Sequence, residues 1–228
     1  MTHETLSPNL RELNFYGKGK AEDIKRGFAV TSLRNPRPDY DFPQMETIAA
    51  NCEDDNEKIP VMIVSNVDAP LNKLPIPLLA LDGFFSAQQA ATEMKVYPGY
   101  EKTTQRTVLK AITFIESESF KRLNPEYQEK LVTEPIFECM KIKGLRWIFF
   151  PTMCRHLSNY GGVTDWIDFL SVNDLISTEE KSKMKNYKYR GMKDTQRLLD
   201  DHPELLQGIS LDPTHPAFKP LVLGISRK

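Results

Sequence analysis

The chain has 228 residues, of which 40% are hydrophobic and 27% are charged, and its formal net charge is −1. This length and apolar content are sufficient for one large domain or two small ones with a substantial core. The near-neutral charge excludes a globally basic nucleic-acid-binding protein, although it is compatible with a local basic patch.

The cysteines and the apolar segments indicate the environment of the protein. The three cysteines, Cys52, Cys139 and Cys154, are odd in number and far apart, which is typical of a reducing compartment. No signal peptide is evident, and the apolar run at 145–150 is too short to span a bilayer. We therefore expect a soluble, cytoplasmic protein with no membrane association. Four histidines without zinc-ligand spacing predict no metal site, and no motif calls for a cofactor.

The first part of the chain predicts alternating strands and helices. Residues 1–26 are polar and predict an N-terminal arm, whereas residues 27–95 predict an α/β layer. A strand is expected over 27–33, which is rich in β-forming residues. The apolar spacing within 44–52 predicts a short amphipathic helix. The continuous apolar run at 59–64 predicts a strand buried on both faces.

The segment 74–94 lies where the sequence changes character. It predicts a buried strand, a tight turn at Asp82-Gly83 and then the start of a helix at about Ala87. We expect this segment to join the α/β layer to a region with a different architecture.

Residues 100–228 predict a mainly helical region that ends in an extended, proline-rich tail. The apolar residues within 108–120 recur on one helical face. Asn124-Pro125 is typical of a helix start, and Ser177 with Glu180 forms a capping-box pattern. The predicted fold is α+β or α/β, with a small N-terminal mixed α/β layer packed on a mainly helical C-terminal region.

The residues from Pro77 to Gly83, followed by 87–91, resemble one segment of the glutathione S-transferases. In that family a strand entered through a cis-proline leads to a helix whose N-terminus binds the γ-glutamyl group of glutathione. The resemblance implies a thioredoxin fold with a helical domain, a cis-proline at Pro77 and a ligand at Gln88 and Gln89. Gln89 stands where the family has serine.

A basic segment at 181–193 contains six cations in thirteen residues, with two tyrosines between them. Such a segment is suited to phosphates and stacked bases, or to an acidic protein partner. A solvated helix face balanced by neighbouring acidic residues is the alternative interpretation. The candidate contact residues are Lys181, Lys183, Lys185, Tyr187, Lys188, Tyr189, Arg190 and Lys193.

These patterns favour a binding or interaction protein that contacts an anionic partner through the segment 181–193. A protein partner is favoured over nucleic acid, and no catalytic residue can be assigned. The alternative is an enzyme or a degenerate enzyme relative, most concretely a glutathione-transferase-like protein with its site near Pro77 and Gln88.

Overall fold

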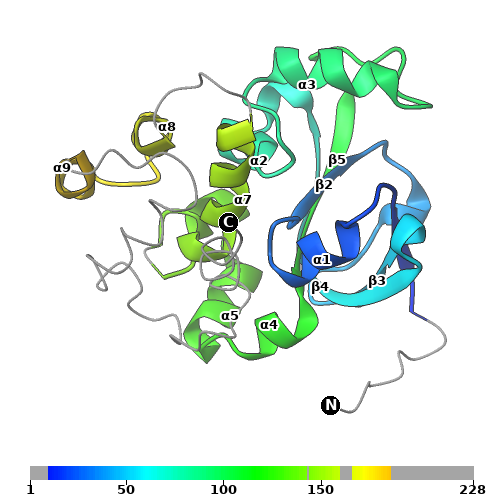
Figure 1. Cartoon of the computed structure of the whole chain (residues 1–228), viewed down its shortest axis with the longest axis horizontal. Helices are drawn as coiled ribbons and strands as arrows, with labels where there is room; N and C mark the ends of the chain where they lie inside the picture. Colours follow the sequence, from blue (N-terminus) through cyan, green and yellow to red (C-terminus); the bar gives the residue numbers. More distant parts are fainter. Residues whose placement is uncertain (1–9, 143, 160–165, 186–228) are drawn as a thin grey trace, which may run out of the picture.

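The structure is a computed structural model that describes residues 10–142, 144–159 and 166–185. Its centre is a curled sheet of five strands in the order β1-β3-β4-β5-β2 (Figure 1). All neighbouring strands are antiparallel except β1 and β3, which are parallel. The strands are β1 Glu12–Phe15, β2 Thr31–Arg34, β3 Thr47–Cys52, β4 Glu57–Pro70 and β5 Val108–Glu116.

Helices lie on both faces of this sheet. One short helix, α1, follows β1, and the helical segments after β5 lie on the opposite side of the molecule (Figure 1). The α-helices are α1 Lys20–Lys25, α2 Ile76–Ala80, α3 Ala87–Glu93, α4 Ser117–Lys121, α5 Pro125–Thr133, α6 Ile136–Cys139, α7 Arg146–Asn159, α8 Trp166–Val172 and α9 Thr178–Lys185. Short 3-10 turns are η1 Pro38–Tyr40, η2 Glu53–Asp55, η3 Leu71–Lys73 and η4 Met94–Val96. The predicted mixture of α and β structure is confirmed.

The sheet separates two hydrophobic cores. The core on the α1 side contains Leu13, Ile24 and Phe114, and the larger core on the other side is formed with the later helices. Strand β5 contributes to both, with Leu109 in the larger core and Ile112 in the smaller one. This strand is therefore covered on both faces.

The helix predicted over 108–120 is wrong, because β5 occupies most of that range. Seven consecutive residues of the strand are buried, so no alternation of apolar and polar residues marks it as a strand. The apolar residues also happen to fall at helical spacing. Only the last part of the range, α4, is helical.

The helix predicted over 44–52 is also wrong. The segment forms β3, whose side chains Ile48, Ala50 and Cys52 enter the smaller core at the two-residue period of a strand. The neighbouring Ala49 is buried as well, and it completed the apparent helical pattern.

Other local predictions are confirmed. The run 59–64 lies within β4. Asn124 caps α5 by accepting a hydrogen bond from the Glu126 N–H at 2.8 Å. Ser177 and Glu180 form a reciprocal capping box, with hydrogen bonds of 3.1 and 2.8 Å to each other's N–H groups.

Helix α2, Ile76–Ala80, stands where a buried strand was predicted. Two prolines stand at its start, where a missing N–H costs no intrahelical hydrogen bond. The helix ends at Ala80, and the predicted Asp82-Gly83 turn follows directly after it. Gly83 has φ +93°, and the Phe84 N–H donates back to the Leu79 carbonyl at 3.0 Å, as in a Schellman motif.

Candidate functional site

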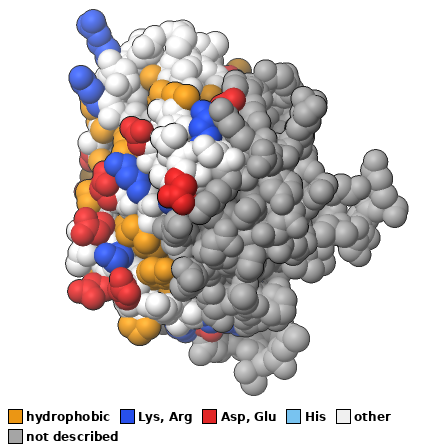
Figure 2. All heavy atoms as spheres, turned by 90° about the vertical axis from the view of Figure 1, so that its left-hand side faces the viewer, with side chains coloured by type: hydrophobic (Ala, Val, Ile, Leu, Met, Phe, Trp, Pro, Cys, Tyr) orange, Lys and Arg blue, Asp and Glu red, His pale blue; other side chains and the backbone are white. Residues whose placement is uncertain are grey.

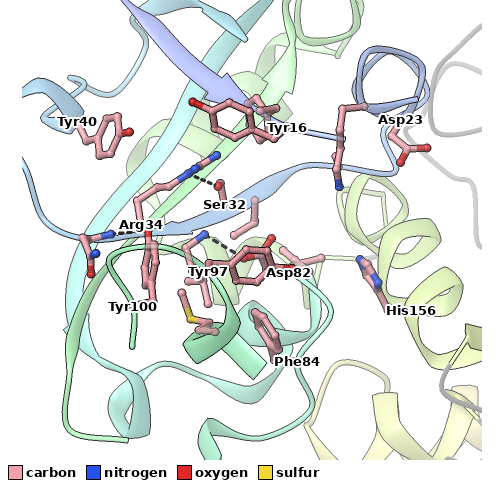
Figure 3. Close-up of a pocket in the computed structure, with 18 of the residues that line it drawn as sticks. Tyr16, Asp23, Ser32, Arg34, Tyr40, Asp82, Phe84, Tyr97, Tyr100 and His156 are labelled. Carbon is pink, nitrogen blue, oxygen red and sulfur yellow. Dashed lines mark hydrogen bonds between the residues drawn. The ribbon is translucent and has the colours of Figure 1, made fainter. Parts of the chain in front are cut away.

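A cavity with a volume of about 830 Å³ lies along the free edge of β2. We call it the β2 pocket. Its walls come from β2, α1, the Asp82–Phe84 turn, the loop 97–100 and His156 of α7 (Figure 3). The pocket therefore collects side chains from segments more than 120 residues apart in the sequence.

The edge of β2 is closed by side chains instead of by another strand. The Phe114 N–H donates to the Val30 carbonyl, and hydrogen-bonded pairs alternate along an antiparallel ladder. The backbone groups of Leu33 consequently point away from β5. The Leu33 N–H donates to Asp82 Oδ2 at 3.0 Å, and the Asn35 N–H donates to the Tyr100 hydroxyl at 3.0 Å (Figure 3). These two contacts satisfy donors that an exposed edge would leave open.

Asp82 is placed by the end of α2. The adjacent Gly83 leaves room for α7, since a Cβ at this position would lie 3.1 Å from His156 Nδ1. Burial raises the pKa of the Asp82 carboxyl to about 6, because a charged carboxylate is poorly solvated there. The Leu33 N–H and the positive charges of Arg34 and Lys20 oppose this shift.

Arg34 bridges the two edge strands beside Asp82. Its Nε donates to the Ser32 hydroxyl at 2.8 Å, and its Nη2 donates to the Asn14 carbonyl of β1 at 2.7 Å. The guanidinium also lies over the Phe15 ring, 5.3 Å from its centroid. The remaining nitrogen, Nη1, has no hydrogen-bond partner among the described residues. Arg34 is therefore held in place while part of its donor capacity is unused.

Aromatic rings line the mouth and the walls of the pocket. Tyr16 and Tyr97 are 61% and 58% exposed, so their ring faces are accessible to a ligand. Tyr100, Phe84 and Tyr40 also line the cavity and are half-buried (Figure 3). Two further cations, Lys20 and Arg37, line the same cavity.

The loop that carries Tyr16 and Lys20 is fixed by acidic residues of η2. The Gly17 N–H donates to Asp54, and the Gly19 and Ala21 N–H groups donate to Asp55 at 2.8 Å. These backbone donors lower the pKa of the Asp55 carboxyl. These hydrogen bonds from the loop backbone to Asp54 and Asp55 thus fix the part of the pocket wall that the loop forms.

The structure places the residues from the glutathione-transferase resemblance outside the β2 pocket. The predicted cis-proline is wrong, because the described part of the chain contains no cis peptide bond and Pro77 lies in the first turn of α2. Gln89 caps its own helix: its side-chain oxygen accepts from the Phe85 N–H at 2.8 Å, while Ser86 accepts from the Gln89 N–H at 3.0 Å. Gln88 is exposed and contacts Gln105 across a separate polar groove.

The basic segment is only partly within the described residues. Lys181 forms an ion pair with Asp168 at 3.0 Å, as in the solvated-face alternative. Lys183 and Lys185 belong to α9, but their side chains lie outside the described residues. Figure 2 shows acidic and basic side chains interspersed over the described part of the helical side. Tyr187, Lys188, Tyr189, Arg190 and Lys193 all lie outside the described residues.

The sequence interpretation did not identify Arg34, Asp82 or the tyrosines as one site. Asp82 was recognised as a turn residue, but its neighbours Leu33 and Arg34 lie about fifty positions earlier. No spacing in the sequence signals such a contact, because it depends on β2 being an edge strand beside the end of α2.

Three general findings complete the description of the structure. None of the described helices is long and apolar enough to cross a membrane. Within the same residues, no three His, Cys, Asp or Glu side chains gather as a metal site. Comparison with known protein families, curated proteins and solved structures found no match to this chain.

Proposed function

We propose that this chain is a binding protein and that its ligand is a planar molecule with an anionic group, held in the β2 pocket. The observation that carries the proposal is the convergence of accessible aromatic rings and cations in one cavity of about 830 Å³. A volume of this size is in the range of pockets that enclose small-molecule ligands.

The aromatic rings account for the planar part of the ligand. Tyr97 and Tyr16 line the pocket and are each more than half exposed, although burial of such rings is usually favourable. Stacking of a ligand ring on them would cover this apolar surface. A stacked base contributes about 1–3 kcal/mol in nucleic-acid complexes.

The cations account for the anionic group. Arg34 retains a free Nη1, and neither Lys20 nor Arg37 makes an ion pair with a described residue. A phosphate or carboxylate near these groups would receive charge-assisted hydrogen bonds. Nucleoside phosphates combine a planar ring with such an anion, so they are the ligand class that we propose.

The two sites expected from the sequence, the glutathione-transferase-like site and the basic segment, differ in how much support they have. The glutathione-transferase-like site lacks support, since Gln89 acts as a helix cap and Pro77 opens a helix. The basic segment 181–193 stays a proposal as a second contact for an anionic partner. The β2 pocket is the described cavity in which aromatic rings and cations meet, whereas Gln88 lines a separate polar groove.

Binding of AMP, CMP, GMP and UMP, measured by titration calorimetry at low ionic strength, tests the proposal. We expect at least one nucleotide to bind with a dissociation constant below about 1 mM. Tyr97→Ala should weaken that binding about five- to tenfold through loss of the stack. The matched control is Val96→Ala, since Val96 is 78% exposed and does not line the pocket. If none of the four nucleotides binds at millimolar concentration, the proposal is wrong.

A further inference from the structure

The carboxyl group of Asp82 has two oxygens in different situations. We propose that its free oxygen, Oδ1, selects the ligand of the β2 pocket by changing from hydrogen-bond acceptor to donor when the carboxyl group gains a proton. This inference rests on the proposed function, because it assigns the polar group that the ligand must present to Asp82.

The geometry fixes which oxygen is available. Oδ2 accepts the Leu33 N–H at 3.0 Å, which ties the carboxyl group to the edge of β2. Oδ1 makes no hydrogen bond to any described residue, and Asp82 lines the pocket. A proton on the group therefore belongs on Oδ1, since Oδ2 already faces a donor. Ionised, Oδ1 only accepts hydrogen bonds, and protonated it donates one.

The surroundings bring this change into an accessible pH range. Burial is the main cause of the raised pKa of about 6, and Arg34 on β2 and Lys20 on α1 partly offset it. The other titratable or charged groups that line the pocket are Asp23 of α1, His156 of α7, Arg37 and the tyrosines Tyr16, Tyr40, Tyr97 and Tyr100. Because an unperturbed histidine also titrates near pH 6.5, a variant at Asp82 is needed to assign the effect.

The two protonation states favour different ligands. Above pH 6, the carboxylate favours a ligand that directs an N–H or O–H group toward the edge of β2. Below pH 6, the carboxylic acid favours a ring nitrogen or a carbonyl oxygen at the same place. A mismatched pair leaves a buried polar group unsatisfied, which costs more than a hydrogen bond gains.

The test compares AMP with purine riboside 5′-monophosphate, which lacks only the 6-amino group and whose base has only acceptors. Calorimetry at pH 5.0 and pH 7.5 gives the ratio of the two dissociation constants. The phosphate also titrates near pH 6, but it does so in both probes and cancels in the ratio. We expect the preference for AMP to increase on the order of tenfold between the two pH values.

Asp82→Asn provides the matched variant. The asparagine oxygen can keep the Leu33 hydrogen bond while its NH₂ group donates, so the variant resembles the protonated state at every pH. We expect its ratio to be independent of pH and close to the wild-type ratio at pH 5.0. A ratio in the wild type that does not change with pH overturns the inference, and so does a pH dependence that persists in Asp82→Asn. If purine riboside 5′-monophosphate and the four nucleotides AMP, CMP, GMP and UMP all fail to bind, the proposed function is contradicted instead.

Discussion

At the scale of single residues, Asp82 combines a structural and a proposed binding role. Its carboxyl group caps the edge of β2 through the Leu33 N–H, yet burial disfavours its charged form. The edge contact and the charge therefore have opposite effects on stability. Their balance depends on pH, which makes it measurable without any ligand.

We predict that Asp82→Asn removes a pH-dependent loss of stability. The folded pKa of Asp82 is about 6 and the ordinary value is 3.8, so the native state holds the proton more tightly than the unfolded state. Stability from this group is highest below the unfolded pKa and falls as the pH rises toward 6. The two pKa values correspond to about 3 kcal/mol.

Urea unfolding of the wild type and Asp82→Asn at pH 4 and pH 7 measures this difference. The advantage of the variant should be about 2–2.5 kcal/mol larger at pH 7 than at pH 4, because part of the unfolded-state carboxyl groups are already ionised at pH 4. An equal difference at both pH values would show that Asp82 does not titrate between them.

At the scale of elements, local capping explains several helix starts that the sequence predicted. In α3 two side chains cap the helix start: Ser86 accepts from the Gln89 N–H, and the Gln89 side chain accepts from the Phe85 N–H. Such hydrogen bonds depend on residues three or four positions apart. For this reason they are visible in the sequence even where the wider fold is not.

We predict that Ser86→Ala lowers the free energy of unfolding by about 1 kcal/mol, since an N-cap hydrogen bond is lost. Gln88→Ala is the matched control, because Gln88 is exposed on the same helix and has no part in the cap. Urea unfolding curves of the two variants give the comparison. Equal effects of both substitutions on the free energy of unfolding would argue against the capping role of Ser86. They would also show that Gln88 contributes to stability.

At the scale of the whole molecule, a buried ion pair joins two helical segments that are distant in sequence. Arg146 Nη1 at the start of α7 lies 3.0 Å from Glu180 Oε1 in α9, and both side chains are at most 9% exposed. The second carboxylate oxygen of Glu180 accepts the Ser177 N–H, and Arg146 also donates to the Lys141 carbonyl at 2.7 Å. The pair thus links the capping box to the core of the helical side.

We predict that Arg146→Met destabilises the protein by about 3–5 kcal/mol, because it removes the guanidinium from a buried ion pair with the Glu180 carboxylate. Lys121→Met is the control, since it removes an exposed ion pair with Glu118 that contributes at most about 1 kcal/mol. Thermal and urea unfolding measure both variants. The double variant Arg146→Met with Glu180→Leu should recover much of the loss, and a double variant as unstable as the single one would contradict the explanation.

Local signals were sufficient for part of the fold. The caps at Asn124 and Ser177, the turn at Asp82-Gly83 and the strand at 59–64 all depend on neighbouring residues, and the structure confirms each of them. Proline positions near 75–77 were read as a strand entry, although they also suit the first turn of a helix. Only the packing of α2 distinguishes the two.

The sequence by itself determined the mixed α/β content, the helix caps and the turns, because these follow from composition and from contacts a few residues apart. The tertiary structure alone decided that β5 is a strand, since burial on both faces hides its period. The tertiary structure also decided which residues line the β2 pocket. Leu33 and Asp82 meet there across about fifty residues, because β2 is an edge strand whose free N–H group needs an acceptor.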